Sequence, residues 1–281
     1  MPAVVSPGVQ ALNAVEGWPA QNVTVAAVAP AGVLDQRGDS SRVFQWASVT
    51  KPVTALAALV AAEEGTLDLD EPAGPPGATV RHLLAHASGL PFEGTAPIAQ
   101  PGKRRIYSNS GFEEVGRALE ARAEMPFEQY LRHAVLDPLG MRETKLVGSP
   151  AAGLQGTLDD LVAFANELLR PTLIAPETLA EATSVQFPGL AGVIPDLGRF
   201  DPNDWGLGFE LKDGKQPHFS GSRTSPRTFG HWGGTGTFLW VDPERDLALA
   251  TLSDLEFGDW AKEAWPRFSD AVAAEAVSDT G

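Results

Sequence analysis

The chain contains 281 residues, of which 43% are hydrophobic and 20% charged, a size and balance typical of a globular protein with a sizeable core. Its 21 basic and 36 acidic residues give a formal net charge of −15, which disfavours nucleic acid and anionic membrane surfaces as partners, because both attract basic patches. The absence of cysteine excludes disulfides, thiolate catalysis and cysteine-ligated metals.

Targeting and linker signals are missing from the sequence. Residues 1–17 lack the basic and apolar regions of a secretory signal peptide, and no apolar run approaches the length of a membrane span. We therefore expect a cytoplasmic protein. No glycine- or serine-rich linker and no internal repeat divides the chain, so we expect a single domain over residues 1–281.

The chain opens with strand signals and then changes to helical spacing. Residues 22–29 (NVTVAAVA) predict a strand, and the turn at residues 30–32 lets residues 33–36 return antiparallel. From Ser48 onward, apolar residues recur every three or four positions, which predicts helices. The predicted helices cover residues 48–65, 81–87, 112–123, 127–134, 157–170 and 176–183.

Strand signals return in the last third of the chain. Residues 206–212, 237–241 and 247–252 predict strands, and residues 260–274 predict a closing helix. This order indicates an α+β fold in which an antiparallel sheet, flanked by terminal helices, carries an inserted all-helical lobe. We expect the α/β lobe at about residues 1–55 and 185–281, and the helical lobe at about 56–184.

A Ser-x-x-Lys motif, Ser48-Val49-Thr50-Lys51, starts the first predicted helix. Residues three apart lie on one helix face, so the Lys51 amine can reach the Ser48 hydroxyl. A helix N-terminus also offers free N–H groups and positive potential where an oxyanion would form. The motif by itself is weak, because a solvated lysine beside a capping serine is the more common arrangement.

Two further motifs strengthen the catalytic interpretation. Tyr107-Ser108-Asn109 lies at a loop-to-helix junction, and His231-Trp232-Gly233 runs into Gly234 at the edge of the late strand region. Penicillin-binding proteins and class A β-lactamases carry Ser-x-x-Lys, Ser-Asp-Asn and Lys-Thr-Gly in this order. Here the second motif has the form Tyr-x-Asn, and the third is His-x-Gly.

With these motifs, the chain resembles the β-lactamase-related serine hydrolases, a group that includes class C β-lactamases, certain D-alanyl-D-alanine peptidases, D-aminopeptidases and esterases. The likeness runs from about Val23 to Leu252 and implies a fold like that of β-lactamases and penicillin-binding proteins. It includes the segments FQWASVTKPVTA, RHLLAHASGL, YSNSGFEEVGRAL, DPLGM, GTLDDLVAFANELL and GHWGGTGTFLWVDP.

The resemblance implies a role for each matching residue. Ser48 would be the acylated nucleophile, and Lys51 would accept or relay its proton. Tyr107 would be the partner base and later the acid toward the leaving group, and Asn109 would bind substrate and help to fix Lys51.

The third motif would complete the site. The backbone N–H groups of Ser48 and Gly234 would form the oxyanion hole, and His231 and Gly233 would line the substrate side of the pocket. The reaction so implied needs neither a metal nor an organic cofactor. Its substrate would be a small ester, amide or peptide-like molecule, and the oligomeric state is not predicted.

Histidine at position 231 departs from the lysine of typical β-lactamases. A neutral imidazole anchors a substrate carboxylate less well than an ammonium does, so we expect only slow β-lactam hydrolysis. We expect esterase activity first, because a protein without an export signal would not meet cell-wall peptidoglycan. The alternative enzymatic activities are those of a D-amino-acid peptidase or amidase and of a weak β-lactamase. The alternative without catalysis is a protein that uses the same fold only for binding. The intact set of Ser48, Lys51, Tyr107 and Asn109 argues against the last.

Other residues near the motifs allow two interpretations. Five basic residues beside the second and third motifs could attract an anionic substrate group or be ordinary solvated residues: Lys103, Arg104, Arg105, Arg223 and Arg227. Trp46 and Trp232 are expected either in the wall of an acyl pocket or in the core. His82 and His86 lack the glutamate of a zinc motif, so we expect them to be structural.

Overall fold

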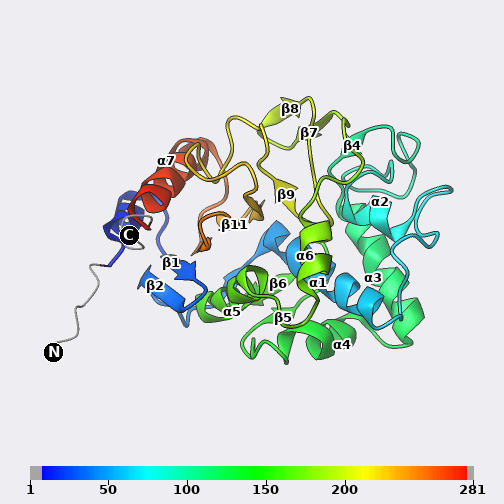
Figure 1. Cartoon of the computed structure of the whole chain (residues 1–281), viewed down its shortest axis with the longest axis horizontal. Coiled ribbons are helices and arrows are strands. Elements are labelled where there is room, and N and C mark those ends of the chain that lie inside the picture. The colour runs from blue at the N-terminus through cyan, green and yellow to red at the C-terminus, as the bar shows by residue number, and fades with distance from the viewer. Residues whose placement is uncertain (1–7, 277–281) are drawn as a thin grey trace.

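An antiparallel sheet of six strands forms one half of the protein (Figure 1). The structure is a computed structural model and describes residues 8–276, so the predicted domain ends at 1–7 and 277–281 lie outside the described residues. In spatial order the strands are β2 (Gly32–Arg37), β1 (Val23–Ala29), β12 (Leu247–Ser253), β11 (Thr237–Asp242), β10 (Phe229–Gly233) and β9 (Glu210–Leu211). The predicted α+β class, with an antiparallel sheet built from both chain ends, is confirmed.

Helices cover both faces of this sheet. The 3₁₀ helix η1 (Gln10–Gly17) and the closing helix α7 (Asp259–Ala276) pack on one face, and α5 (Leu158–Leu169) packs on the other. Alternate residues of β1 therefore join different apolar clusters: Val25 and Ala27 face α7, whereas Ala26 and Val28 face the helical side. Burial on both faces explains why this strand is apolar at every position except Thr24 instead of alternating between apolar and polar residues.

The segment between the strands is mostly helical. It contains α1 (Thr50–Glu63), α2 (Val80–Leu84), α3 (Asn109–Ala123), α4 (Phe127–Leu131), the π turn η3 (Arg132–Leu136), α5 and α6 (Pro176–Ala182). Helix α1 lies at its centre, and every residue from Thr50 to Ala61 is buried. The helix itself consists mostly of small and apolar residues, because this stretch has no side that faces solvent.

Short strands connect the helical segment to the sheet side, and the sequence did not predict them. One small sheet pairs β3 (Phe44–Gln45), β6 (Leu154–Gly156) and β5 (Lys145–Leu146), and a second pairs β4 (Arg105–Ile106), β7 (Gly192–Ile194) and β8 (Gly198–Phe200). The insert is therefore not entirely helical. Strands of two or three residues are too short to show a period, so only their tertiary partners identify them.

The strand predicted over residues 206–212 is mostly wrong, because only β9 (Glu210–Leu211) forms there. Gly208 has a φ of +83°, and its N–H donates to Leu84 O at 3.0 Å, so the backbone leaves the sheet. A Cβ at this position would lie 2.3 Å from the Ala55 Cβ on α1. The glycine thus allows the chain to turn tightly over α1 before β9 begins.

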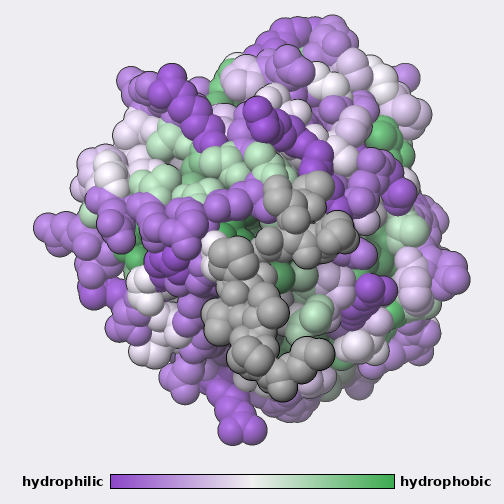
Figure 2. Space-filling view, turned by 60° about the vertical axis from the view of Figure 1, so that its left-hand side comes forward, coloured by the Kyte–Doolittle hydropathy of each residue, from purple (hydrophilic) through white to green (hydrophobic). Residues whose placement is uncertain are grey.

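One apolar cluster joins residues of the sheet to residues of α1, α3 and α5. The division into two lobes near residues 56 and 184 stays a prediction. Polar side chains cover most of the face shown in Figure 2, in keeping with the acidic composition. Between residues 8 and 276, no helix has the length and apolar character needed to cross a bilayer.

Candidate active site

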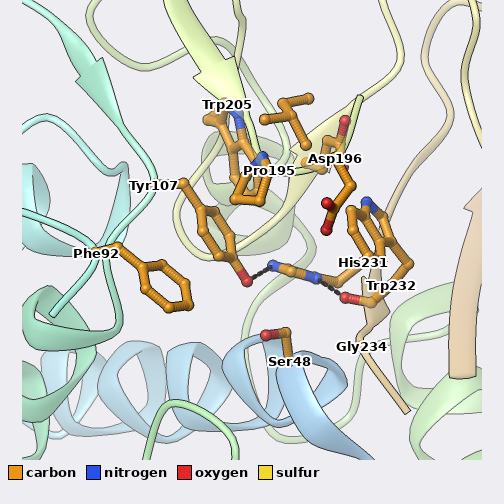
Figure 3. Close-up of a pocket in the computed structure, with 11 residues that line it drawn as sticks. Ser48, Phe92, Tyr107, Pro195, Asp196, Trp205, His231, Trp232 and Gly234 are labelled. Atoms are coloured by element: carbon orange, nitrogen blue, oxygen red, sulfur yellow. Dashed lines mark hydrogen bonds between the residues drawn. The ribbon is translucent and has the colours of Figure 1, made fainter. Parts of the chain in front are cut away.

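Ser48 lies at the N-terminal end of α1, inside the short 3₁₀ turn η2 (Ala47–Val49), and borders a pocket (Figure 3). The preceding residue, Ala47, has a φ of 45°, a left-handed conformation that is unfavourable for a residue with a Cβ. Tertiary hydrogen bonds hold it there, since Trp46 N donates to Leu154 O and Thr237 Oγ1 donates to Trp46 O, both at 2.9 Å. The turn therefore fixes the position of the Ser48 hydroxyl.

The Lys51 amine is fully buried and has three oxygen neighbours. Its Nζ lies 3.0 Å from Ser48 Oγ, 2.8 Å from Asn109 Oδ1 and 3.0 Å from Ala151 O. Burial lowers the pKa of Lys51 to about 7, against an opposing effect of Glu113. Two of the neighbours are carbonyl oxygens that only accept, so a neutral amine donates its two hydrogens to them. Its lone pair then faces the Ser48 hydroxyl.

Strand β4 and the start of α3 position the second motif. Ser108 caps α3, because its Oγ accepts the Gly111 N–H at 2.9 Å, and its own N–H donates to His86 Nδ1 at 3.1 Å. Tyr107 precedes this cap and Asn109 follows it, so both side chains are fixed relative to Lys51. His86 is fully buried and structural, as the sequence predicted.

His231 lies on β10 and faces Tyr107 across the pocket (Figure 3). Burial, reinforced by Lys51, lowers the pKa of His231 to about 3, so its imidazole is neutral. Nδ1 lies 2.7 Å from Trp232 O, a pure acceptor, and must carry the proton. Nε2 is therefore an acceptor, and the Tyr107 hydroxyl donates to it at 3.5 Å.

Burial also raises the pKa of Tyr107 well above its usual range, and a hydrogen bond with Ser48 opposes this only in part. The side chain is a neutral phenol at pH 7. Its hydroxyl lies between Ser48 and His231, and the Lys51 Nζ lies 4.7 Å from its ring centroid. A neutral phenol in this place can pass a proton but does not act as a strong base.

The two glycines after His231 have different surroundings. A Cβ at Gly233 would lie 2.5 Å from both Trp46 O and Thr237 Oγ1, so the absence of a side chain lets β10 pack against the turn that carries Ser48. Gly233 does not line the pocket that borders Ser48, whereas Gly234 does. A Cβ at Gly234 would meet nothing within 4 Å. The structure thus gives Gly233 a packing role and places Gly234 at the pocket.

The pocket encloses about 490 Å³ of space, which includes space open to solvent. Its lining is mainly apolar and aromatic: Ser48, Phe92, Tyr107, Ile194, Pro195, Asp196, Trp205, Glu210, His231, Trp232 and Gly234. Trp232 lines it and Trp46 does not. Lys51 and Asn109 lie behind Ser48 and connect to it through hydrogen bonds.

Sequence reasoning missed six lining residues: Phe92, Ile194, Pro195, Asp196, Trp205 and Glu210. All six lie outside the three motifs, in loops or on strands of two or three residues. Glu210 gave one usable signal, because an acid inside the apolar run GLGFEL is unusual. Trp205 is only 1% exposed and nevertheless borders the pocket.

No lysine or arginine is among the lining residues of this pocket. The five basic residues near the motifs therefore do not line this pocket, and the hypothesis that some of them attract an anionic substrate group stays a prediction. The buried Arg105 guanidinium instead donates to backbone oxygens, among them Asn203 O at 3.0 Å and Ala85 O at 2.6 Å. Arg227 lines a separate surface pocket.

Comparisons with known proteins agree on one family. The family model for Beta-lactamase matches residues 6–274. A crystal structure of a beta-lactamase from Mycobacterium bovis is 51% identical to this chain, with a TM-score of 0.94, and the match covers 95% of this chain and 100% of that chain. The predicted fold, like that of β-lactamases and penicillin-binding proteins, is confirmed.

More distant relatives show how widely this fold is used. Penicillin-binding protein 4* of Bacillus subtilis is 26% identical over 222 residues, which are 64% of this chain and 49% of that protein. The chain therefore spans about half the length of this relative. A hydrolase with promiscuous acyltransferase activity shares the fold, with a TM-score of 0.77 at 18% identity over 94% of this chain and 97% of that one.

Proposed function

The chain belongs to the beta-lactamase family of serine hydrolases, and from this premise we propose that it cleaves small esters through an acyl intermediate on Ser48. The observation that carries the proposal is the hydrogen bonding of Lys51. Two carbonyl oxygens bind both hydrogens of the neutral amine and leave its lone pair toward the Ser48 hydroxyl at 3.0 Å. This arrangement supports proton abstraction from the nucleophile.

In the proposed acylation, Ser48 Oγ attacks the ester carbonyl while its proton passes to Lys51 Nζ. The N–H groups of Ser48 and Gly234 stabilise the oxyanion of the tetrahedral intermediate; one such donor contributes about 3–4 kcal/mol. When the C–O bond to the leaving group breaks, the proton returns through the Tyr107 hydroxyl to the departing oxygen. The products of this half-reaction are an alcohol and acyl-Ser48.

Deacylation repeats the same chemistry with water. Water attacks the acyl carbonyl, Lys51 takes its proton, and Ser48 Oγ leaves as the alkoxide and regains a proton from Lys51. The carboxylic acid is released. His231 accepts the Tyr107 hydrogen bond and so orients the phenol toward the nucleophile, which makes it a positioning residue in this scheme.

The pocket favours esters over β-lactams and peptides that end in a carboxylate. Both of those substrates carry an anion that needs a cationic or strongly donating partner. The lining offers a neutral His231 and the acids Asp196 and Glu210, and it contains no basic side chain. A neutral ester avoids this mismatch.

Hydrolysis rates for three substrate classes test the proposal. We expect p-nitrophenyl butanoate to be turned over with a kcat/KM at least 100-fold above those of nitrocefin and a D-alanyl-D-alanine peptide. Ser48→Ala should remove ester turnover, whereas Ser41→Ala, on an exposed turn, serves as the matched control. Ester turnover that persists in Ser48→Ala, or no turnover of any ester, would contradict the proposed function.

A further inference from the structure

Glu210 is one of the residues that line the same pocket as Ser48, and it has no role in the mechanism above. It lies on β9 and pairs with Gly230 of β10, the residue that precedes His231. The side chain is 1% exposed. Burying a carboxylate is costly unless hydrogen bonds or a counter-charge compensate for the lost water.

Within residues 8–276, neither carboxyl oxygen of Glu210 has a hydrogen-bond partner with normal geometry. His218 Nε2 and Lys215 Nζ lie 3.6 and 4.0 Å from Oε1, beyond hydrogen-bond distance. Lys215 donates instead to Asp204 O and Leu211 O. Lys215 thus supplies a counter-charge to Glu210 at 4.0 Å, whereas the two carboxyl oxygens, buried in the pocket wall, keep acceptor positions that no residue between 8 and 276 fills.

The charges around the pocket indicate which ligand group fits. Asp196 is exposed, and its backbone has a φ of 61°. The view into the pocket shows Asp196 near His231 and Trp232 (Figure 3). Burial raises the pKa of Glu210 to about 7, and both Lys215 and Trp232 oppose this effect. A cation beside the carboxyl would favour its ionised form and fill its free acceptor positions.

We propose that Glu210 binds a protonated amine of the substrate, so that the preferred substrates are esters that carry an ammonium group. The inference rests on the proposed function, since it names the substrate class of the same site. Asp196 assists by attracting the cation toward the pocket. Trp205 and Trp232 pack against the carbon chain next to the amine, because both indoles line the pocket beside Glu210.

Isosteric ester pairs with one leaving group test the charge preference directly. p-Nitrophenyl 3-aminopropanoate is compared with the butanoate, and the 6-aminohexanoate with the heptanoate. We expect the amine to raise kcat/KM roughly tenfold or more in at least one pair, mainly through a lower KM, because a charge-assisted hydrogen bond forms on binding. No preference for the amine in either pair would overturn the proposal.

The variant Glu210→Gln should lower the amine-to-neutral ratio of kcat/KM about tenfold. Glu177→Gln, an exposed residue on α6, is the matched control and should keep the wild-type ratio. A ratio that stays unchanged in Glu210→Gln would overturn the proposal.

If Glu210→Gln does not fold, inhibition of the wild-type protein decides the question. Butylammonium should compete with the neutral ester at a concentration at least tenfold lower than 1-butanol, and equal inhibition would overturn the proposal. Hydrolysis of neutral esters by Ser48 without any amine preference would refute this inference alone. Failure to hydrolyse any ester would refute the proposed function.

Discussion

The pH dependence of Ser48 acylation follows from the buried position of Lys51. With its ordinary pKa of 10.5, holding this amine neutral at pH 7 would cost about 5 kcal/mol. Because burial lowers the pKa to about 7, that cost falls to near zero at neutral pH. The neutral form is the active base, so activity is present above this pKa and is lost as the pH falls through it.

The acylation rate should therefore be constant above about pH 8 and should drop about tenfold for each pH unit below 7, to roughly 1% of the plateau at pH 5. The assay is the labelling rate with an uncharged fluorophosphonate, followed by intact-protein mass spectrometry from pH 5 to pH 10. His231 does not interfere, because its pKa of about 3 keeps it neutral throughout.

Glu210 also titrates near pH 7 and needs a control. The same profile measured on Glu210→Gln should keep its acidic limb if the limb belongs to Lys51. A rate that keeps rising to pH 10, or a limb that disappears in Glu210→Gln, would refute the assignment of Lys51 as the base.

Three further substitutions separate proton transfer from packing. Tyr107→Phe should slow the turnover of alkyl esters about 100-fold with little change in KM, since it removes the proton relay to the leaving group. Thioesters, whose thiolate leaves without a proton, should be slowed less, and an equal loss for both substrates would argue against that role. Asn109→Ala should slow phosphonylation 10- to 100-fold at the plateau pH, because Lys51 loses the acceptor at 2.8 Å; an unchanged rate would contradict the hydrogen-bonding argument. Gly233→Ala should lower the free energy of unfolding by about 1–3 kcal/mol in urea, because its Cβ would lie 2.5 Å from two oxygen atoms. Gly234→Ala is the matched control, with nothing within 4 Å of the added carbon, and should unfold like wild type.

The sequence predicted the parts of the site that lie in short motifs. Ser48 and Lys51 share a helix face, so their contact follows from the helical repeat alone. The meeting of Asn109 with Lys51 needed the resemblance to a family, because 58 positions separate the two residues. Their convergence depends on how α1 and α3 pack, which no local pattern encodes.

The parts that sequence reasoning missed depend on tertiary contacts. Glu210 borders the pocket only because Gly208 turns the backbone over Ala55, and the same turn shortened the strand predicted there. Arg105 follows the same rule: it is close to the second motif in the sequence and does not line the pocket, since adjacency along the chain does not fix side-chain direction. Arg105 points into the core and hydrogen bonds to loop carbonyls that a sequence cannot place.

The most direct test of the account is to capture the covalent intermediate. Wild-type protein is mixed with p-nitrophenyl butanoate, quenched in acid during turnover, digested and examined by peptide mass spectrometry. We expect a butanoyl group on the peptide that contains Ser48, at the serine itself, and a burst of p-nitrophenol equal to the enzyme concentration. Steady turnover without an acylated Ser48, or acylation at another residue that persists in Ser48→Ala, would contradict it.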